Sequence, residues 1–363
     1  MVEAPPGNTA TLEPYANPGS LGHPMHYQGG QADIVDLVAY GDGFVAGGFL
    51  ETATGPKAAA WASPDGLRWS LIEGFPTTEG SLVRAVATGP GGVLVAVGAD
   101  GRHPAAWHST DGRTWRRSSS ASLGSEQAEL ATVVSTPSGF LAAGRAGGLG
   151  TETRASFWSS ADGLEWTRGP DGPDAAAARV ESLAGSAGTW VAVGVAVRGT
   201  SISGGAAWTS TDGRSWRRAP ATQPQFGPLH GVTTSPDGFI AVGTNLAGTK
   251  AVVLSSSDGL AWRAAPDAGA LDNYGLQIEM RDVARVGDTY IAVGHLLFGT
   301  QFPSGVIWSS PNGLTWTRAP DTAMFQQAKI AAVTGSNGRA VAVGTFGSPD
   351  FAIPTIWVSP PQG

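Results

Sequence analysis

Titratable side chains interrupt an otherwise small and apolar pattern at a few places in this chain. Alanine occupies positions 131, 331 and 332, but the corresponding positions elsewhere hold charged or imidazole groups. These are Asp36, Arg84, Glu181, His230, Arg281 and Asp282. An arginine fork can hold a carboxylate through two hydrogen bonds, a glutamate can transfer protons, and a histidine can act as a base. The set therefore indicates either a ligand pocket or, as the alternative, charged strand ends that water solvates.

We expect a ligand-binding site that combines these polar groups with nearby aromatic residues. The candidates are Asp36, Arg84, Glu181, His230, Tyr274, Arg281, Asp282, His295, Phe298 and Phe302. If the site is catalytic, the participants expected first are Arg84, Glu181, His230, Arg281 and His295. The remaining apolar loop residues in this region are Leu297, Phe346, Phe351 and Ile353.

The sequence assigns no cofactor and no metal site. A pair spaced as His23-x-x-His26 could join His230 or His295 in holding a divalent cation, but no carboxylate is fixed beside it. His103 is a further histidine expected on the same face. Cysteine is absent, which excludes disulfides, thiolate metal sites and cysteine nucleophiles. No Gly-x-Ser-x-Gly elbow and no phosphate-binding loop occurs.

The elements that must position these residues form a repeat. The pattern Ser-x-Asp-Gly-x-x-Trp begins at Ser63, Ser109, Ser160, Ser210 and Ser256, and a sixth copy at Ser310 has Asn312 in place of aspartate. A seventh copy starts at Trp357 and stops at the chain end. An apolar run that ends in glycine precedes each copy, as in Phe140 to Gly144. All 13 tryptophans occupy repeat positions, although Leu254 takes the first tryptophan position of the fifth copy.

Each repeat predicts four short strands, a to d. Strand b is the apolar run, strand c the segment before Asp-Gly, and strand d follows the tight turn that Asp-Gly favours. Four-stranded units that recur every 40 to 50 residues indicate the blades of a β-propeller. We expect the paired tryptophans to pack between neighbouring blades, which favours a structural role over a carbohydrate-stacking surface. A calcium site at the Asp-Gly turns is also not favoured, since one carboxylate supplies too few ligands.

The predicted fold is all-β, a seven-bladed β-propeller in a single domain over residues 1–363. The predicted blades are 33–76, 80–120, 128–170, 178–220, 228–266, 278–320 and 328–363, preceded by a connector in 1–32. The last unit lacks its strand d, and an unpaired edge is unfavourable. Residues 10–14, which end in Pro14, are predicted to supply that strand and to join the two ends of the chain.

The Ser-x-Asp-Gly-x-x-Trp turn resembles the Asp-box, or BNR-type, repeat of sialidases and related propellers, although its spacing is one residue shorter. The resemblance covers nearly the whole chain and is carried by the six hairpins, such as Ser63 to Trp69. It implies a propeller whose boxes lie on c–d hairpins, opposite the active site. It does not extend to the sialidase Phe-Arg-Ile-Pro motif, which is absent, and sialidases have six blades.

The composition excludes several classes of protein and partner. A net charge of −7 disfavours a nucleic-acid partner, and no apolar run is long enough for a membrane span. With 14% charged and 41% hydrophobic residues, intrinsic disorder is excluded. We expect an extracytoplasmic or secreted monomer that binds a small molecule, glycan or protein at its loop-rich face. The alternative is a glycoside hydrolase or lyase that works at the mouth of the central channel, and a purely structural repeat is the third reading.

Overall fold

The computed structural model describes most of the chain. The described residues are 32–66, 68–124, 126–148, 152–171, 175–186, 188–220, 226–266, 269–272, 277–297, 303–320, 325–336, 338–347 and 353–359, together with the backbone of 13–14. They form seven antiparallel sheets of four strands each. Two 3-10 turns, Pro90–Gly92 and Ala121–Leu123, are the helical segments in this part of the chain. It contains no helix that could cross a lipid bilayer.

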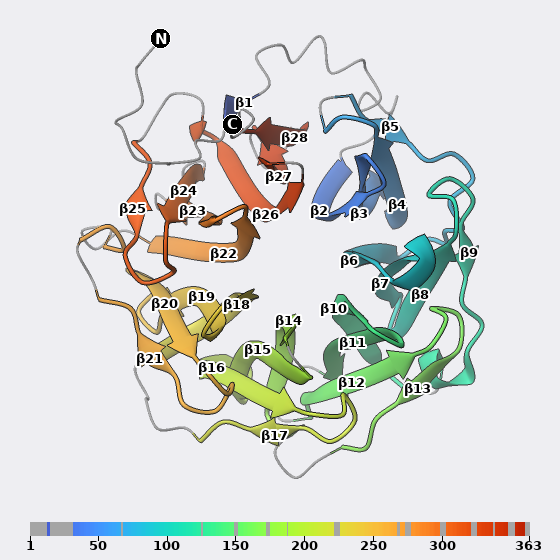
Figure 1. The fold of residues 1–363 in the computed structure, drawn as a ribbon. Coiled ribbons are helices and arrows are strands. Elements are labelled where there is room, and N and C mark those ends of the chain that lie inside the picture. Colours follow the sequence, from blue (N-terminus) through green and yellow to red (C-terminus); the bar gives the residue numbers. More distant parts are fainter. Residues whose placement is uncertain are drawn as a thin grey trace.

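The sheets are arranged as blades around a central channel (Figure 1). Blade 1 contains β2 (Ala32–Tyr40), β3 (Gly43–Thr52), β4 (Gly55–Ser63) and β5 (Ser70–Leu71). Blade 2 contains β6 (Ser81–Thr88), β7 (Leu94–Asp100), β8 (His103–Ser109) and β9 (Arg116–Arg117). Blade 3 contains β10 (Ala128–Thr136), β11 (Gly139–Ala146), β12 (Arg154–Ser160) and β13 (Trp166–Arg168). Blade 4 contains β14 (Ala178–Ser186), β15 (Thr189–Arg198), β16 (Ser201–Ser210) and β17 (Arg217–Arg218).

The remaining three blades follow the same plan. Blade 5 contains β18 (Phe226–Ser235), β19 (Gly238–Asn245), β20 (Ala251–Ser256) and β21 (Arg263–Ala264). Blade 6 contains β22 (Gln277–Val286), β23 (Thr289–Leu297), β24 (Ser304–Ser310) and β25 (Thr317–Arg318). Blade 7 contains β26 (Ala328–Ser336), β27 (Arg339–Phe346), β28 (Ile353–Val358) and β1 (Glu13–Pro14). The first strands of successive blades contact one another in a closed ring.

The ring closes through both ends of the chain, as the sequence predicts. In blade 7, β1 pairs antiparallel with β28, with Glu13 opposite Val358 and Pro14 opposite Trp357. The N-terminal strand thus supplies the outermost strand of the last blade and leaves no blade with three strands. The prediction of a seven-bladed propeller closed in this way is confirmed.

Tryptophans fill the spaces between blades. Ten of the 13 are buried, and the half-buried ones are Trp190, Trp216 and Trp262. Trp107 and Trp115 of blade 2 pack with Val45 and Ala60 of blade 1 in one apolar cluster. Because burial of an indole removes about 200 Å² from water, these side chains hold adjacent sheets together. The predicted packing of tryptophan between blades is confirmed.

The Asp-Gly hairpins are held by their own side chains. In the blade 3 hairpin, Ser160 Oγ accepts the amide of Gly163 at 2.8 Å, and Asp162 Oδ1 accepts the amides of Leu164 and Glu165 at 2.8 and 2.9 Å. These amide bonds hold the pKa of Asp162 below its ordinary value. Gly163 has a φ of +79°, a conformation that glycine adopts without strain. The aspartates of these turns therefore stabilise the hairpins by accepting backbone amides.

Candidate functional site

The seven inner strands share one irregularity that creates the site. Each has a β-bulge at the same place, so that one residue has no partner on the neighbouring strand. The residues at the bulges are Val35, Arg84, Ala131, Glu181, His230, Arg281 and Ala331. All seven line a single central cavity of about 590 Å³. The bulges thus form a ring of side chains around the channel.

Side chains two residues before the bulges form a second ring. Its members are Asp33, Leu82, Glu129, Arg179, Pro228, Glu279 and Lys329. Of these, Asp33, Glu129, Arg179 and Lys329 line the cavity. All of these positions lie near the starts of the inner strands, opposite the ends of the second strands. The cavity therefore lies toward the face that carries the connections between strands b and c.

Arginine and glutamate pairs connect the wall between blades 2 and 3. Arg84 Nε lies 2.7 Å from Glu129 Oε1, and Arg145 Nη2 lies 3.1 Å from Glu129 Oε2. Burial opposes ionisation of Glu129, but the two guanidinium groups outweigh it and hold the pKa of Glu129 below its ordinary value. Glu129 is therefore an ionised anchor for two arginines.

The wall of blades 4 to 6 combines two arginines with two glutamates and a histidine. Arg179 Nε donates to Glu181 Oε1 at 2.6 Å. Arg281 Nη1 lies 3.4 Å from His230 Nδ1 and 3.5 Å from Glu279 Oε2. Burial lowers the pKa of His230 well below its ordinary value, and the charges of Arg281 and Arg179 lower it further. His230 is accordingly a neutral imidazole between two arginines.

Asp36 and Asp282 lie in the cavity wall but bond to backbone. The amides of Leu37 and Val86 each donate to Asp36 at 2.8 Å, and the amide of Val333 donates to Asp282 Oδ2 at 2.9 Å. Val86 and Val333 belong to the following blade, so each aspartate joins two blades. Burial raises the pKa of Asp36 to about 7, and the nearby charge of Asp282 adds to this increase against its amide bonds.

The structure brings together most, but not all, of the residues that the sequence indicated. Asp36, Arg84, Glu181, His230, Arg281 and Asp282 line the cavity. His295 is buried, with 2% of its surface exposed, and its Nε2 lies 3.6 Å from Glu279 Oε2 behind the cavity wall. Burial, followed by the charges of Lys329 and Arg281, lowers the pKa of His295 to about 3. Tyr274, Phe298, Phe302, Phe351, His23 and His26 lie outside the described residues.

Several cavity residues were not among the expected site residues. They are Asp33, Glu129, Arg179, Ser182 and Lys329, of which Lys329 forms no ion pair within 4 Å inside the described ranges. One signal could have located this wall: in six blades the bulge lies thirteen residues before the glycine that ends the apolar run, as Glu181 lies before Gly194. Among the described residues, no cluster of three or more histidine and carboxylate groups could hold a metal ion.

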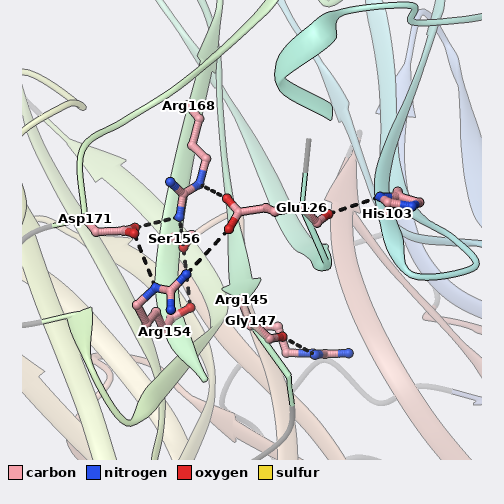
Figure 2. Close-up of polar contacts among 8 residues, drawn as sticks. All are labelled: His103, Glu126, Arg145, Gly147, Arg154, Ser156, Arg168 and Asp171. Carbon is pink, nitrogen blue, oxygen red and sulfur yellow. Dashed lines mark hydrogen bonds and ion pairs between the residues drawn. The ribbon is translucent and has the colours of Figure 1, made fainter. Parts of the chain in front are cut away.

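A second charged cluster lies on blade 3 (Figure 2), and its two arginines and two acids are not among the residues that line the cavity. Arg168 contacts Glu126 at 2.7 Å and Asp171 at 2.6 Å, and Arg154 contacts the same two acids at 3.5 and 3.3 Å. His103, from blade 2, bonds to the backbone oxygen of Glu126. Two cations match two anions here, so the cluster is an internal network that joins neighbouring blades.

Comparisons with known proteins support the fold. No known family matches the chain, and no curated protein matches it. The structure is similar to that of YCF48 bound to D1 peptide, at 14% identity and a TM-score of 0.61, with 100% of this chain and 98% of that chain covered. It is also similar to virginiamycin B lyase from Staphylococcus aureus, at 9% identity and a TM-score of 0.58, over 90% of this chain and 95% of that chain. A sialidase from Trypanosoma rangeli has 13% identity and a TM-score of 0.52, over 91% of this chain and 55% of that chain.

Proposed function

We propose that this protein binds a peptide or a segment of a protein, whose charged groups enter the central cavity. The observation that carries the proposal is the lining of that cavity of about 590 Å³, which contains five cationic and five carboxyl side chains. This volume is typical of ligand sites. A peptide offers amides, carboxylates and ammonium groups that can match charges of both signs. Among the described lining residues, Phe49 is the one that is Phe, Tyr or Trp, so the cavity offers a glycan little aromatic surface for stacking.

Hydrolase or lyase activity is less well supported by the same side chains. A glycoside hydrolase needs a carboxyl group that holds a proton near neutral pH. Glu129 does not, because its two arginines keep it ionised. Burial raises the pKa of Asp33, Asp36 and Asp282. Asp36 and Asp282 each accept a backbone amide of the following blade and so hold adjacent blades together. Among the described lining residues, Asp33 is then the one carboxyl group with a raised pKa that is left to hold such a proton. The neutral His230 bonds to an arginine and has no acid partner among its described contacts.

Two further considerations support a binding role and its context. A propeller that is similar over its full length has been solved with a peptide bound, and this analogy of fold agrees with the charged cavity. We extend the proposal to an Asp-box-like origin of the hairpins, a single domain over residues 1–363, an extracytoplasmic location and a monomeric state. The hairpin geometry, in which serine and aspartate cap their own turn, supports the first of these.

Affinity selection from random hexapeptides tests the proposed function. The immobilised protein should enrich a defined set of peptides, which mass spectrometry of the eluate identifies. Arg84→Glu reverses a charge inside the cavity and should abolish the enrichment. Arg217→Glu is the matched control, since Arg217 lies exposed on the outermost strand β17 and should leave the enrichment unchanged.

The proposal fails if no peptide is enriched, or if Arg84→Glu and Arg217→Glu behave alike. A fluorogenic sialoside supplies the test of the runner-up function. Turnover that disappears in Glu181→Gln would replace binding with hydrolysis as the function of the cavity, because Glu181 is a cavity residue able to transfer protons.

A further inference from the structure

Three polar side chains from consecutive blades converge on one wall of the cavity. Arg179 comes from blade 4, His230 from blade 5 and Arg281 from blade 6. All three line the same cavity, and the positive charges of both arginines act on the His230 ring. His230 and Arg281 occupy the bulge positions, so the backbone directs both side chains toward the channel. The wall is therefore an arrangement of donors that the fold itself creates.

The contact with Arg281 decides which nitrogen of His230 carries the proton. A guanidinium group can only donate hydrogen bonds, so His230 Nδ1, at 3.4 Å from Arg281 Nη1, must be the acceptor. The proton of the neutral ring is then on Nε2. Within the described residues, His230 has no other hydrogen bond, and it lines the cavity. The imidazole thus offers one N–H group to a bound molecule.

The charge balance of this wall limits the ligand. Arg179 already contacts Glu181 at 2.6 Å, and Arg281 contacts Glu279 at the longer distance of 3.5 Å. In the part of the chain that the structure describes, these contacts use Arg179 Nε and Arg281 Nη1, so other guanidinium N–H groups remain for a ligand. Because each arginine already contacts one glutamate, the wall has no large excess of positive charge and suits a group with one negative charge better than a dianion.

We propose that Arg179, His230 and Arg281 together bind the C-terminal carboxylate of a peptide, an inference that rests on the proposed peptide-binding function. A carboxylate is planar, carries a single charge and accepts the paired N–H groups of a guanidinium fork. A chain terminus, unlike an internal acidic residue, can enter an axial cavity end-on. Glu181 and Asp33, which also line the cavity, then face the amides and side chains of the preceding residues.

Histidine-selective NMR tests this assignment directly. The protein, labelled with ¹³C and ¹⁵N in its six histidines, is titrated with N-acetyl-alanyl-alanine, with the amide of the same dipeptide, and with N-acetyl-alanyl-aspartic acid α-amide, which keeps a free side-chain carboxylate. The His230→Gln variant identifies the His230 signals. The free acid should shift the His230 signals in a saturable way, and both amidated peptides should leave them unchanged.

Variants separate the carboxylate contact from a general effect on the fold. Arg281→Lys keeps the charge but removes the fork, and Arg179→Gln removes the charge. Each should weaken binding of the free acid by at least about tenfold, which corresponds to about 1.4 kcal/mol, because a charge-assisted hydrogen bond to the carboxylate is lost. Arg217→Gln, on the exposed strand β17, should leave the affinity unchanged. Circular dichroism of each variant checks that the propeller is folded.

The outcomes distinguish this inference from the proposed function. Equal binding of the free acid and the amide overturns the carboxylate site but keeps peptide binding. Binding of the aspartate peptide without the free acid overturns the assignment to the chain terminus. No response of His230 to any probe overturns the site, and peptides that remain enriched on the wild-type protein would then show that the proposed function stands without it.

Discussion

Ionisation of the buried Asp36 lowers the stability of the native state. Its carboxyl group is enclosed at the junction of blades 1 and 2, and burial raises its pKa to about 7 in spite of two amide donors. The pKa of an aspartate in an unfolded chain is about 3.9. Between these values the native state binds a proton that the unfolded state has released, so native stability must fall as pH rises from about 4 to about 7.

The variant Asp36→Asn tests this dependence, because it is uncharged at every pH. The melting temperature of the wild type minus that of the variant should decrease as pH rises from 5 to 8, and thermal melts followed by circular dichroism give both values. The difference is needed because buried His230 and His295 act in the opposite sense. Their lowered pKa values remove stability as pH falls below about 6.5, equally in both proteins.

Asp42→Asn, on the exposed turn between β2 and β3, is the matched control for the loss of a carboxyl group. A wild-type advantage over Asp36→Asn that grows toward pH 8 would contradict the assignment of a buried carboxyl group with a raised pKa.

At the residue scale, the sequence could identify some cavity residues and not others. His230 and Arg281 were recognisable because the same place in other repeats holds alanine. Arg179 and Lys329 lie two residues before the bulges at Glu181 and Ala331. Strand alternation places residues two apart on the same face, so Arg179 could have been inferred once Glu181 was assigned to the channel. Lys329 gave no such signal, because the bulge position of blade 7 holds alanine.

At the scale of the element, a steric constraint explains why the residue that ends each apolar run is glycine. The backbone oxygen of the residue two before the bulge lies against it, and a Cβ on Gly98 would come 2.0 Å from the oxygen of Leu82. The other six such glycines show the same approach, at 1.8 to 2.0 Å. The sequence displays these glycines plainly, but only the bulge explains why no larger residue fits.

Gly98→Ala should consequently destabilise blade 2. The methyl group meets backbone atoms, which cannot rotate away, so we expect a loss of about 1–3 kcal/mol or more in the free energy of unfolding. Urea denaturation measures it. Gly124→Ala is the control, since a Cβ there would find its nearest neighbour at 3.9 Å and the backbone is near the helical region. If the two variants unfolded at the same urea concentration, the steric explanation would be wrong.

Blade 5 departs from the repeat in a way that leaves space. Leu254 stands where other blades place their first tryptophan, and a cavity of about 70 Å³ lies beside it between blades 4 and 5. Phe226, Leu229 and Trp262 also line this cavity. The irregularity is visible in the sequence, but the size of the space depends on how Arg218 and the neighbouring side chains pack.

Leu254→Trp should fill that cavity and raise the free energy of unfolding by about 0.5–2 kcal/mol, as cavity-filling changes commonly do. Leu94→Trp is the comparison, because Leu94 is fully buried in the packed cluster between blades 1 and 2. There the larger ring must displace its neighbours and lower the stability. Guanidinium denaturation of both variants measures the changes, and a destabilised Leu254→Trp would show that the cavity cannot admit an indole.

At the scale of the whole molecule, the propeller depends on contacts between residues far apart in sequence. The fold could be predicted because six copies of one hairpin motif fix the blade, and the incomplete seventh copy implies a partner strand. The ring of inner strands then follows from closure. Closure does not determine which side chains line the channel. These depend on seven bulges whose residues differ from blade to blade.

The pairing of β1 with β28 provides the final test of this closure. Deletion of residues 1–16 removes Glu13 and Pro14, exposes the edge of β28 and leaves blade 7 without its outermost strand. The melting temperature should therefore fall by several degrees. Deletion of residues 1–10 keeps the paired strand and should preserve the melting temperature. A synthetic peptide of residues 8–18, added to the longer deletion, should recover part of the loss by binding to β28. Since the edge strand acts only through this pairing, an unchanged melting temperature after removal of residues 1–16 would mean that the tryptophan packing between blades closes the ring by itself.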